Sequence, residues 1–136
     1  MTVKAKDAAG NASAASNALN VSTIDTHAPT VPTDLAATGV ITETSFTLAW
    51  TASSDNVSVT GYNVYQDGIQ VTIVTGTSAS ITGLSPSTVY AMTVKAKDAA
   101  GNVSAASSVL NVSTIDTHAP TIPTGLTASV ITETSF

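Results

Sequence analysis

The chain has 136 residues, of which 43% are hydrophobic and only 10% charged, and four lysines face nine acidic side chains for a net charge of −5. This acidic balance excludes the basic surface that nucleic-acid binding requires, and no apolar run reaches the roughly 18 residues of a membrane span. Cysteine is absent, which excludes a disulfide framework. Stability must therefore come from packing of a hydrophobic core.

The sequence contains one long stretch twice. Residues 92–136 repeat residues 1–46 with few changes, at an offset of 92 − 1 = 91 that falls to 90 after Gly39, which has no counterpart. Similarity at a fixed period indicates a tandem array. The chain therefore spans about one and a half periods, and a period of about 90 residues can bury a modest core.

Residues 1–24 alternate apolar and polar side chains on both sides of Asp7-Ala-Ala-Gly-Asn11. Gly and Asn accept the positive φ of a tight turn, so this stretch predicts two strands joined by a hairpin. Residues 25–33 follow as a linker. Pro29 and Pro32 restrict its backbone to extended geometry, which makes it stiffer than a Gly/Ser linker.

Residues 34–114 are the only complete unit. Short alternating runs separated by Gly, Asn, Asp and Pro predict strands and no helix. Seven strands in about 80 residues fit a two-sheet sandwich. The side chains predicted to form its core are Phe46, Trp50, Tyr62, Tyr90, Met92 and Val94.

The stretch Leu84-Ser85-Pro86-Ser87-Thr88-Val89-Tyr90 resembles the L-x-P-x-T-x-Y corner of fibronectin type III domains. Trp50 is similar in position to the core tryptophan of that family, and the resemblance covers Pro32 to about Thr114. The ring of a tyrosine at such a corner packs inward, and its hydroxyl hydrogen-bonds to the upstream backbone. The resemblance implies an all-β, seven-strand antiparallel immunoglobulin-like sandwich, of the kind found in bacterial extracellular tandem arrays.

The resemblance also implies domain boundaries. Residues 1–24 would be the C-terminal part, strands F and G, of a preceding repeat, and residues 25–33 a linker. Residues 34–114 would be the complete domain, residues 115–123 a second linker, and residues 124–136 the N-terminal part, strands A and B, of a following repeat. Neither partial domain can bury its apolar face alone, so we expect strand pairing with other copies or neighbouring repeats.

Candidate catalytic groups are few, and we predict no enzymatic activity. His27 and His118 occupy equivalent linker positions, so no Ser-His-Asp arrangement arises within one domain. Glu43 and Glu133 are copies of one another on a surface loop. A glycosidase requires two carboxyl groups that face one cleft, and nothing in the sequence indicates such a cleft.

One metal site is predicted, with calcium as the only candidate cofactor. In the fibronectin-like topology, the linker before a domain ends at the same pole as the loop between strands B and C and the loop between strands F and G. Asp25 lies on the linker, Asp55 on the B–C loop and Asp98 on the F–G loop, so the three carboxylates would converge. Calcium takes six to eight oxygen ligands, carboxylates among them. The linker Asp25-Thr26-His27-Ala28-Pro29 resembles those of many large bacterial adhesins that are rigidified by calcium, although its His departs from the commoner Thr or Glu. The alternative is that each aspartate makes a side-chain turn with nearby backbone N–H groups.

Two functions remain open, both extracellular or at the cell surface. The first is a structural repeat of a large bacterial surface protein that spaces, stiffens or polymerises as an adhesin, fibre or filament segment. The second is a spacer or weak carbohydrate-associated module of a secreted carbohydrate-active enzyme. Binding to a cell-surface or polysaccharide ligand needs an exposed aromatic platform, for which Tyr65 is the only candidate.

Overall fold

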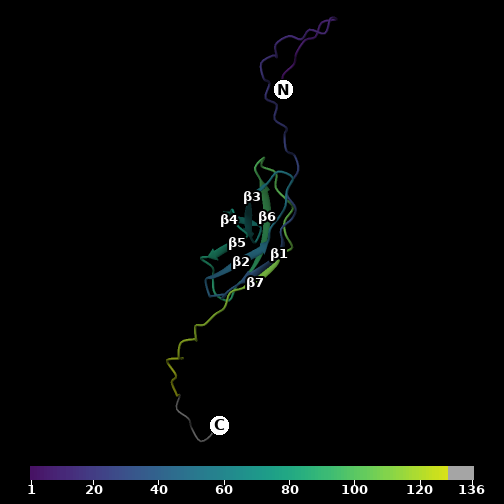
Figure 1. The fold of residues 1–136 in the computed structure, drawn as a ribbon. Helices are drawn as coiled ribbons and strands as arrows, with labels where there is room; N and C mark the ends of the chain where they lie inside the picture. The colour runs from purple at the N-terminus through teal and green to yellow at the C-terminus, as the bar shows by residue number, and fades with distance from the viewer. Residues whose placement is uncertain (129–136) are drawn as a thin grey trace.

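Seven strands form between Thr33 and Ser113 in the computed structural model, which describes residues 1–128 (Figure 1). They are β1 (Thr33–Thr38), β2 (Ser45–Thr51), β3 (Val59–Gln66), β4 (Ile69–Val74), β5 (Ser78–Thr82), β6 (Val89–Asp98) and β7 (Leu110–Ser113). Over the described length the chain contains no helix, and thus none that could cross a membrane.

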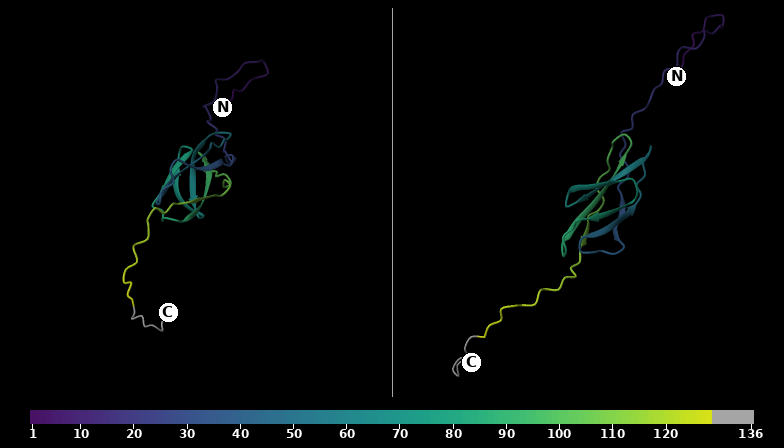
Figure 2. Two further views of the ribbon diagram at one scale, coloured as in Figure 1. Left: turned by 90° about the horizontal axis from the view of Figure 1, so that it is seen from below. Right: turned by 90° about the vertical axis from the view of Figure 1, so that its left-hand side faces the viewer.

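The strands form two antiparallel sheets, β1-β2-β5 and β4-β3-β6-β7, which pack face to face (Figure 2). Burial alternates along β2 and β6, as expected for strands with one face on a core. The six side chains predicted for the core are at most 8% exposed: Phe46, Trp50, Tyr62, Tyr90, Met92 and Val94. The predicted seven-strand sandwich is therefore confirmed.

Two tyrosine hydroxyls tie loops to the core. Tyr90 forms the predicted corner, because its hydroxyl accepts a 2.8 Å hydrogen bond from the backbone N–H of Ser85. Tyr62 makes a second anchor that the sequence did not predict, accepting a 2.9 Å bond from the N–H of Ser53. Its ring meets that of Trp50 edge to face, with centroids 5.4 Å apart. The loop after β2 is thereby fixed in place.

Residues 1–24 lie apart from the sandwich (Figures 1 and 2). The chain reverses after Asp7, but a single isolated bridge between Lys6 and Ala12 replaces the two predicted strands. Met1 and Leu19 are 84% and 64% exposed. The prediction of strands was wrong here because a two-stranded hairpin without a further strand or a core to pack on is only marginally stable.

The two linkers leave the sandwich at opposite ends (Figure 1). β1 begins at Thr33, the last residue of the first predicted linker. Pro29 and Pro32 of this linker are buried against the domain that follows. Their counterparts in the second linker, Pro120 and Pro123, are exposed. The side chains of the first linker therefore lie at one end, or pole, of the sandwich, and those of the second linker lie at the opposite pole.

Candidate functional sites at the two poles

The pole at the first linker gathers three carboxylates. Asp25 comes from the linker, Asp55 from the loop between β2 and β3, and Asp98 from the end of β6. One carboxylate oxygen of each lies within 4.8 Å of the others. The three residues predicted from the sequence are therefore brought together, while calcium binding itself stays a prediction.

Asp98 is the most deeply placed member of this aspartate cluster, with only 1% of its surface exposed. Its two carboxylate oxygens accept hydrogen bonds of 2.8 Å and 2.7 Å from the backbone N–H and side-chain amide of Asn102. Burial by itself raises the pKa of Asp98, but these bonds and the N–H groups of Gly101 and Ala100 outweigh it and hold the pKa below its ordinary value. Asp98 is therefore anionic at neutral pH.

Asp25 and Asp55 each satisfy one carboxylate oxygen locally. Oδ2 of Asp55 accepts from the N–H groups of Val57 and Ser58, and Oδ1 of Asp25 accepts from that of His27. These contacts are the side-chain turns of the alternative interpretation. The other oxygens, Asp25 Oδ2 and Asp55 Oδ1, are buried and have no hydrogen-bond partner. Because a buried unpaired charge is costly, an oxygen-only donor set with two such atoms fits a hard cation such as calcium.

Asn102 connects this cluster to the linker backbone. Its side-chain amide nitrogen lies 3.2 Å from the carbonyl oxygens of both Asp25 and His27, in addition to its bond to Asp98. Its amide N–H groups therefore hold the linker against the domain.

The opposite pole holds the second linker through Glu43. Oε1 of Glu43 accepts a 2.7 Å bond from the N–H of Thr117, a further bond from the Thr117 hydroxyl, and lies 2.9 Å from Nδ1 of His118. These contacts lower the pKa of Glu43 below its ordinary value. The hydrogen bond from the Thr117 hydroxyl contributes most, followed by that from the Thr117 N–H and then by His118. Sequence reasoning assigned Glu43 and His118 no contact. No local signal could have found one, because they lie 75 residues apart.

The chemistry available at this second pole is limited. Glu43, Asp116 and His118 offer ligand atoms within 4.8 Å of one another, but Glu43 Oε1 already has three partners. The Thr117 hydroxyl donates to the carboxylate, and no hydrogen bond found in residues 1–128 joins it to the imidazole, which a nucleophile and its base would need. The arrangement is a polar tether.

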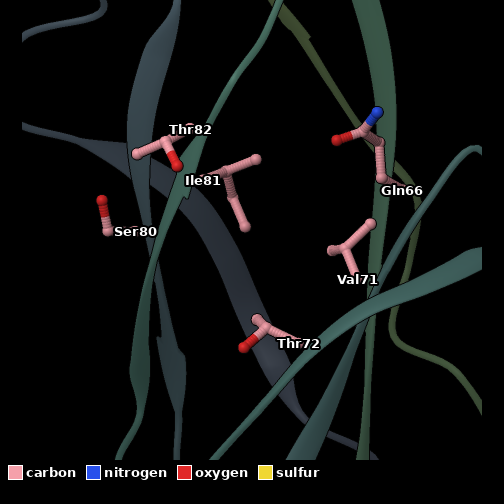
Figure 3. A pocket seen from close by; sticks show the side chains of 6 residues that line it. All are labelled: Gln66, Val71, Thr72, Ser80, Ile81 and Thr82. Carbon is pink, nitrogen blue, oxygen red and sulfur yellow. The ribbon is translucent and has the colours of Figure 1, made fainter.

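A shallow hollow of about 270 Å³ lies between β4 and β5 (Figure 3). Its lining is uncharged and contains no aromatic ring: Gln66, Val71, Thr72, Ser80, Ile81 and Thr82. Tyr65, the candidate platform, is half-buried, and Nζ of Lys95 lies 5.3 Å from its ring centroid. One face of that ring is therefore already occupied, and within the described residues no open aromatic platform for sugars is found.

Comparison with known proteins identifies relatives for most of the chain. The fibronectin type III domain profile matches residues 30–113. Chitinase A1 of Niallia circulans is 62% identical over 118 residues, 83% of this chain and 17% of that protein. Exoglucanase B of Cellulomonas fimi is 53% identical over 117 residues, 83% of this chain and 11% of that protein. Chitinase ChiA74 from Bacillus thuringiensis superposes with a TM-score of 0.65 at 37% identity, over 71% of this chain and 15% of that structure.

These relatives bear on the two functions left open by the sequence. The chain spans less than a fifth of the length of each, and all three are named as enzymes. They favour the predicted module of a carbohydrate-active enzyme over the predicted adhesin or filament segment, for which these relatives give no support.

Proposed function

Since the chain belongs to the fibronectin type III domain family, we propose that it is a non-catalytic spacer module of a secreted enzyme that hydrolyses an insoluble polysaccharide. The observation that carries this proposal is its 62% and 53% identity to segments of a chitinase and an exoglucanase. A chitin or glucan polymer is too large to enter a bacterial cell. The enzyme would therefore work outside the cell or at its surface.

The proposal assigns polysaccharide contact to neighbouring domains of the enzyme. Four of the aromatic side chains that a sugar could stack on are buried in the core, and Lys95 covers one face of Tyr65. An exposed aromatic surface is the usual requirement for stacking on a polar ligand. The chain would thus set distance and orientation, and it would leave binding to other modules.

Co-sedimentation with insoluble chitin and with cellulose tests this division of labour. We expect the 136-residue chain to remain in the supernatant with both polymers. Retention on either polymer would contradict a pure spacer and favour the carbohydrate-associated alternative. In that event Tyr65→Ala, with Tyr62 left in the core, would show whether the half-buried ring provides the contact.

Calcium binding by the cluster of Asp25, Asp55 and Asp98 is a second part of the proposal, supported by the two buried oxygens without partners. Binding to the folded state raises stability by mass action, about 2.7 kcal/mol at a hundredfold excess over Kd. We expect millimolar calcium to raise the melting temperature and chelator to reverse the rise. Asp25→Asn should abolish the shift, and Asp116→Asn, the same change in the other linker, should not. An unchanged melting temperature would end this part of the proposal.

Other copies of the repeat are proposed as partners of residues 1–24, whose apolar side chains are exposed. Exposed apolar surface on an extended segment favours pairing with another chain. Sedimentation velocity over a range of concentrations would detect self-association. Removal of residues 1–24 should eliminate it, and association that persists without them would place the contact elsewhere.

A further inference from the structure

The two linkers carry the same sequence but are bound from opposite sides. Residues 24–29 and 115–120 both read Ile-Asp-Thr-His-Ala-Pro. The first copy contacts the domain that follows it, and the second contacts the domain that precedes it. Together they show both halves of a junction that, in an array, would meet on one linker.

The following domain holds its linker from residue 25 to residue 32. Asn102 binds the carbonyl oxygens of Asp25 and His27. Thr30 and Ser54 exchange two bonds, of 2.8 Å from Thr30 N–H to the Ser54 carbonyl and 2.9 Å from Ser54 N–H to the Thr30 hydroxyl. Burial of Pro29 and Pro32 completes this contact.

The preceding domain holds its linker from residue 115 to residue 118. The N–H of Ile115 donates to the carbonyl of Thr42, and the carbonyl of Ile115 accepts from Ser87, each at 3.3 Å. Beyond it, Thr117 and His118 contact Glu43. Every residue of this segment therefore either contacts the preceding domain or lies next to a residue that does.

The two sets of contacts overlap on the tripeptide Asp-Thr-His, since residues 116–118 are the copies of residues 25–27. They use different atoms. The preceding domain takes the Thr N–H, the Thr hydroxyl and the His ring, and the following domain takes the Asp side chain and the Asp and His carbonyls. The local turn is also shared, because the His N–H donates to the Asp Oδ1 in both copies, at 3.0 Å and 2.9 Å.

We propose that, where one complete repeat follows another, both domains hold this tripeptide at the same time and form a hinge-free joint. The partner surface is a second copy of the same unit, and Pro120 and Pro123 would bury against it as Pro29 and Pro32 do here. The inference deepens the proposed spacer role by assigning it a fixed inter-domain angle. It depends on hydrogen bonds more than on apolar contact, so single substitutions should release it.

A two-unit protein tests the joint: residues 1–114 followed directly by residues 24–136. Each unit can fold in it, because the core is complete between Leu35 and Val112. The chain has no cysteine, so Gln70→Cys, an exposed strand position, places one spin label in each unit. Double electron–electron resonance then gives the distribution of distances between units. We expect one narrow distribution, clearly narrower than in a reference protein with Gly-Gly-Ser inserted into the joint.

Glu43→Ala supplies both the decisive variant and its control. In the first unit it removes the anchor of the joint and should broaden the distribution toward that of the Gly-Gly-Ser reference. In the second unit it faces away from the joint and should leave the distribution narrow. In the 136-residue chain the same change should speed hydrogen exchange of the Thr117 amide, while an unchanged melting temperature shows that the domain stays folded.

Two results would overturn the proposal. The first is a distance distribution in the unaltered two-unit protein that is as broad as that of the Gly-Gly-Ser reference. The second is a distribution that stays narrow when the first unit carries Glu43→Ala. A flexible joint would leave the proposed spacer function intact, since that function is tested by polymer binding and hydrolysis. Retention of the chain on a polymer would conversely leave the joint intact.

Discussion

Residues 1–24 and 92–115 carry nearly the same sequence in different surroundings, and their local hydrogen bonds are the same. Oδ1 of Asp7 accepts from the N–H of Asn11 at 2.8 Å, and Asp98 does so from Asn102 at the same distance. The hydroxyl of Ser16 accepts from the N–H of Val3 at 3.0 Å, and that of Ser107 accepts from Val94 at 3.0 Å. The turn and its serine bonds are thus properties of the local sequence.

Burial separates the two copies. Val3 is 73% exposed and Met1 84%, whereas Val94 and Met92 are both fully buried. Only the second copy forms regular strands, because β3 pairs with β6 from Met92 to Asp98 and the opposing sheet covers it. The alternating pattern therefore fixes which side chains can face a core, and the surrounding strands decide whether a core exists.

Truncation of the matched valines should give the largest difference between the copies. Val94→Ala removes two buried carbons and leaves a cavity, and we expect a loss of about 2–3 kcal/mol in the free energy of unfolding. Val3→Ala should change it by less than about 0.5 kcal/mol, as is usual for exposed sites. Urea denaturation followed by Trp50 fluorescence measures both. Equal losses would mean that residues 1–24 share the core.

Removal of the matched serine hydroxyls should have a smaller effect. Ser107→Ala leaves the buried N–H of Val94 without its acceptor, which costs about 1–2 kcal/mol. In Ser16→Ala the N–H of Val3 is exposed, and water can replace the hydroxyl. The same denaturation experiment should show no change for Ser16→Ala. A loss as large as that of Ser107→Ala would contradict the local interpretation of these bonds.

Replacement of the matched asparagines separates the turn from the linker contact. Asn11→Ala and Asn102→Ala both remove a side-chain bond to an aspartate, but only Asn102 also binds Asp25 and His27. We expect Asn102→Ala to cost about 1 kcal/mol more than Asn11→Ala. Hydrogen exchange at the Thr30 amide should rise in Asn102→Ala alone. An unchanged exchange rate of the Thr30 amide in Asn102→Ala would show that Asn102 is not a tether.

The smallest of these expected effects is a loosening of the second linker on acidification. The pKa of Glu43 is lower in the folded chain than its ordinary value of 4.5, so its contribution is complete above that value and is lost as pH falls through the lowered pKa. The NMR signal of the Thr117 amide should shift over this acidic range. Glu43→Gln should remove the titration, and a shift that survives it would assign the effect to another carboxyl group.

The fold and one of the two poles were predictable from the sequence. The alternation around Phe46 and Trp50 identified the core. The resemblance to fibronectin type III domains supplied the topology that brought Asp25 to the loops of Asp55 and Asp98, because in that topology the linker and the two loops share one end of the sandwich. The contact of Glu43 with the second linker was not predictable, since polar surface contacts across 75 residues leave no periodic pattern. The prediction of strands in residues 1–24 was wrong because the alternating pattern is a local property of the sequence, whereas a stable strand needs a sheet to pair with.

Hydrolysis of a soluble and an insoluble substrate by one enzyme tests the spacer function most directly. In Niallia circulans chitinase A1, the segment that this chain matches can be kept, deleted, or replaced by residues 25–118. We expect deletion to lower the rate on insoluble chitin and to leave the rate on a short soluble chitin oligomer unchanged, and we expect the replacement to restore the insoluble rate. A rate of hydrolysis of insoluble chitin that deletion leaves unchanged would contradict a spacer role.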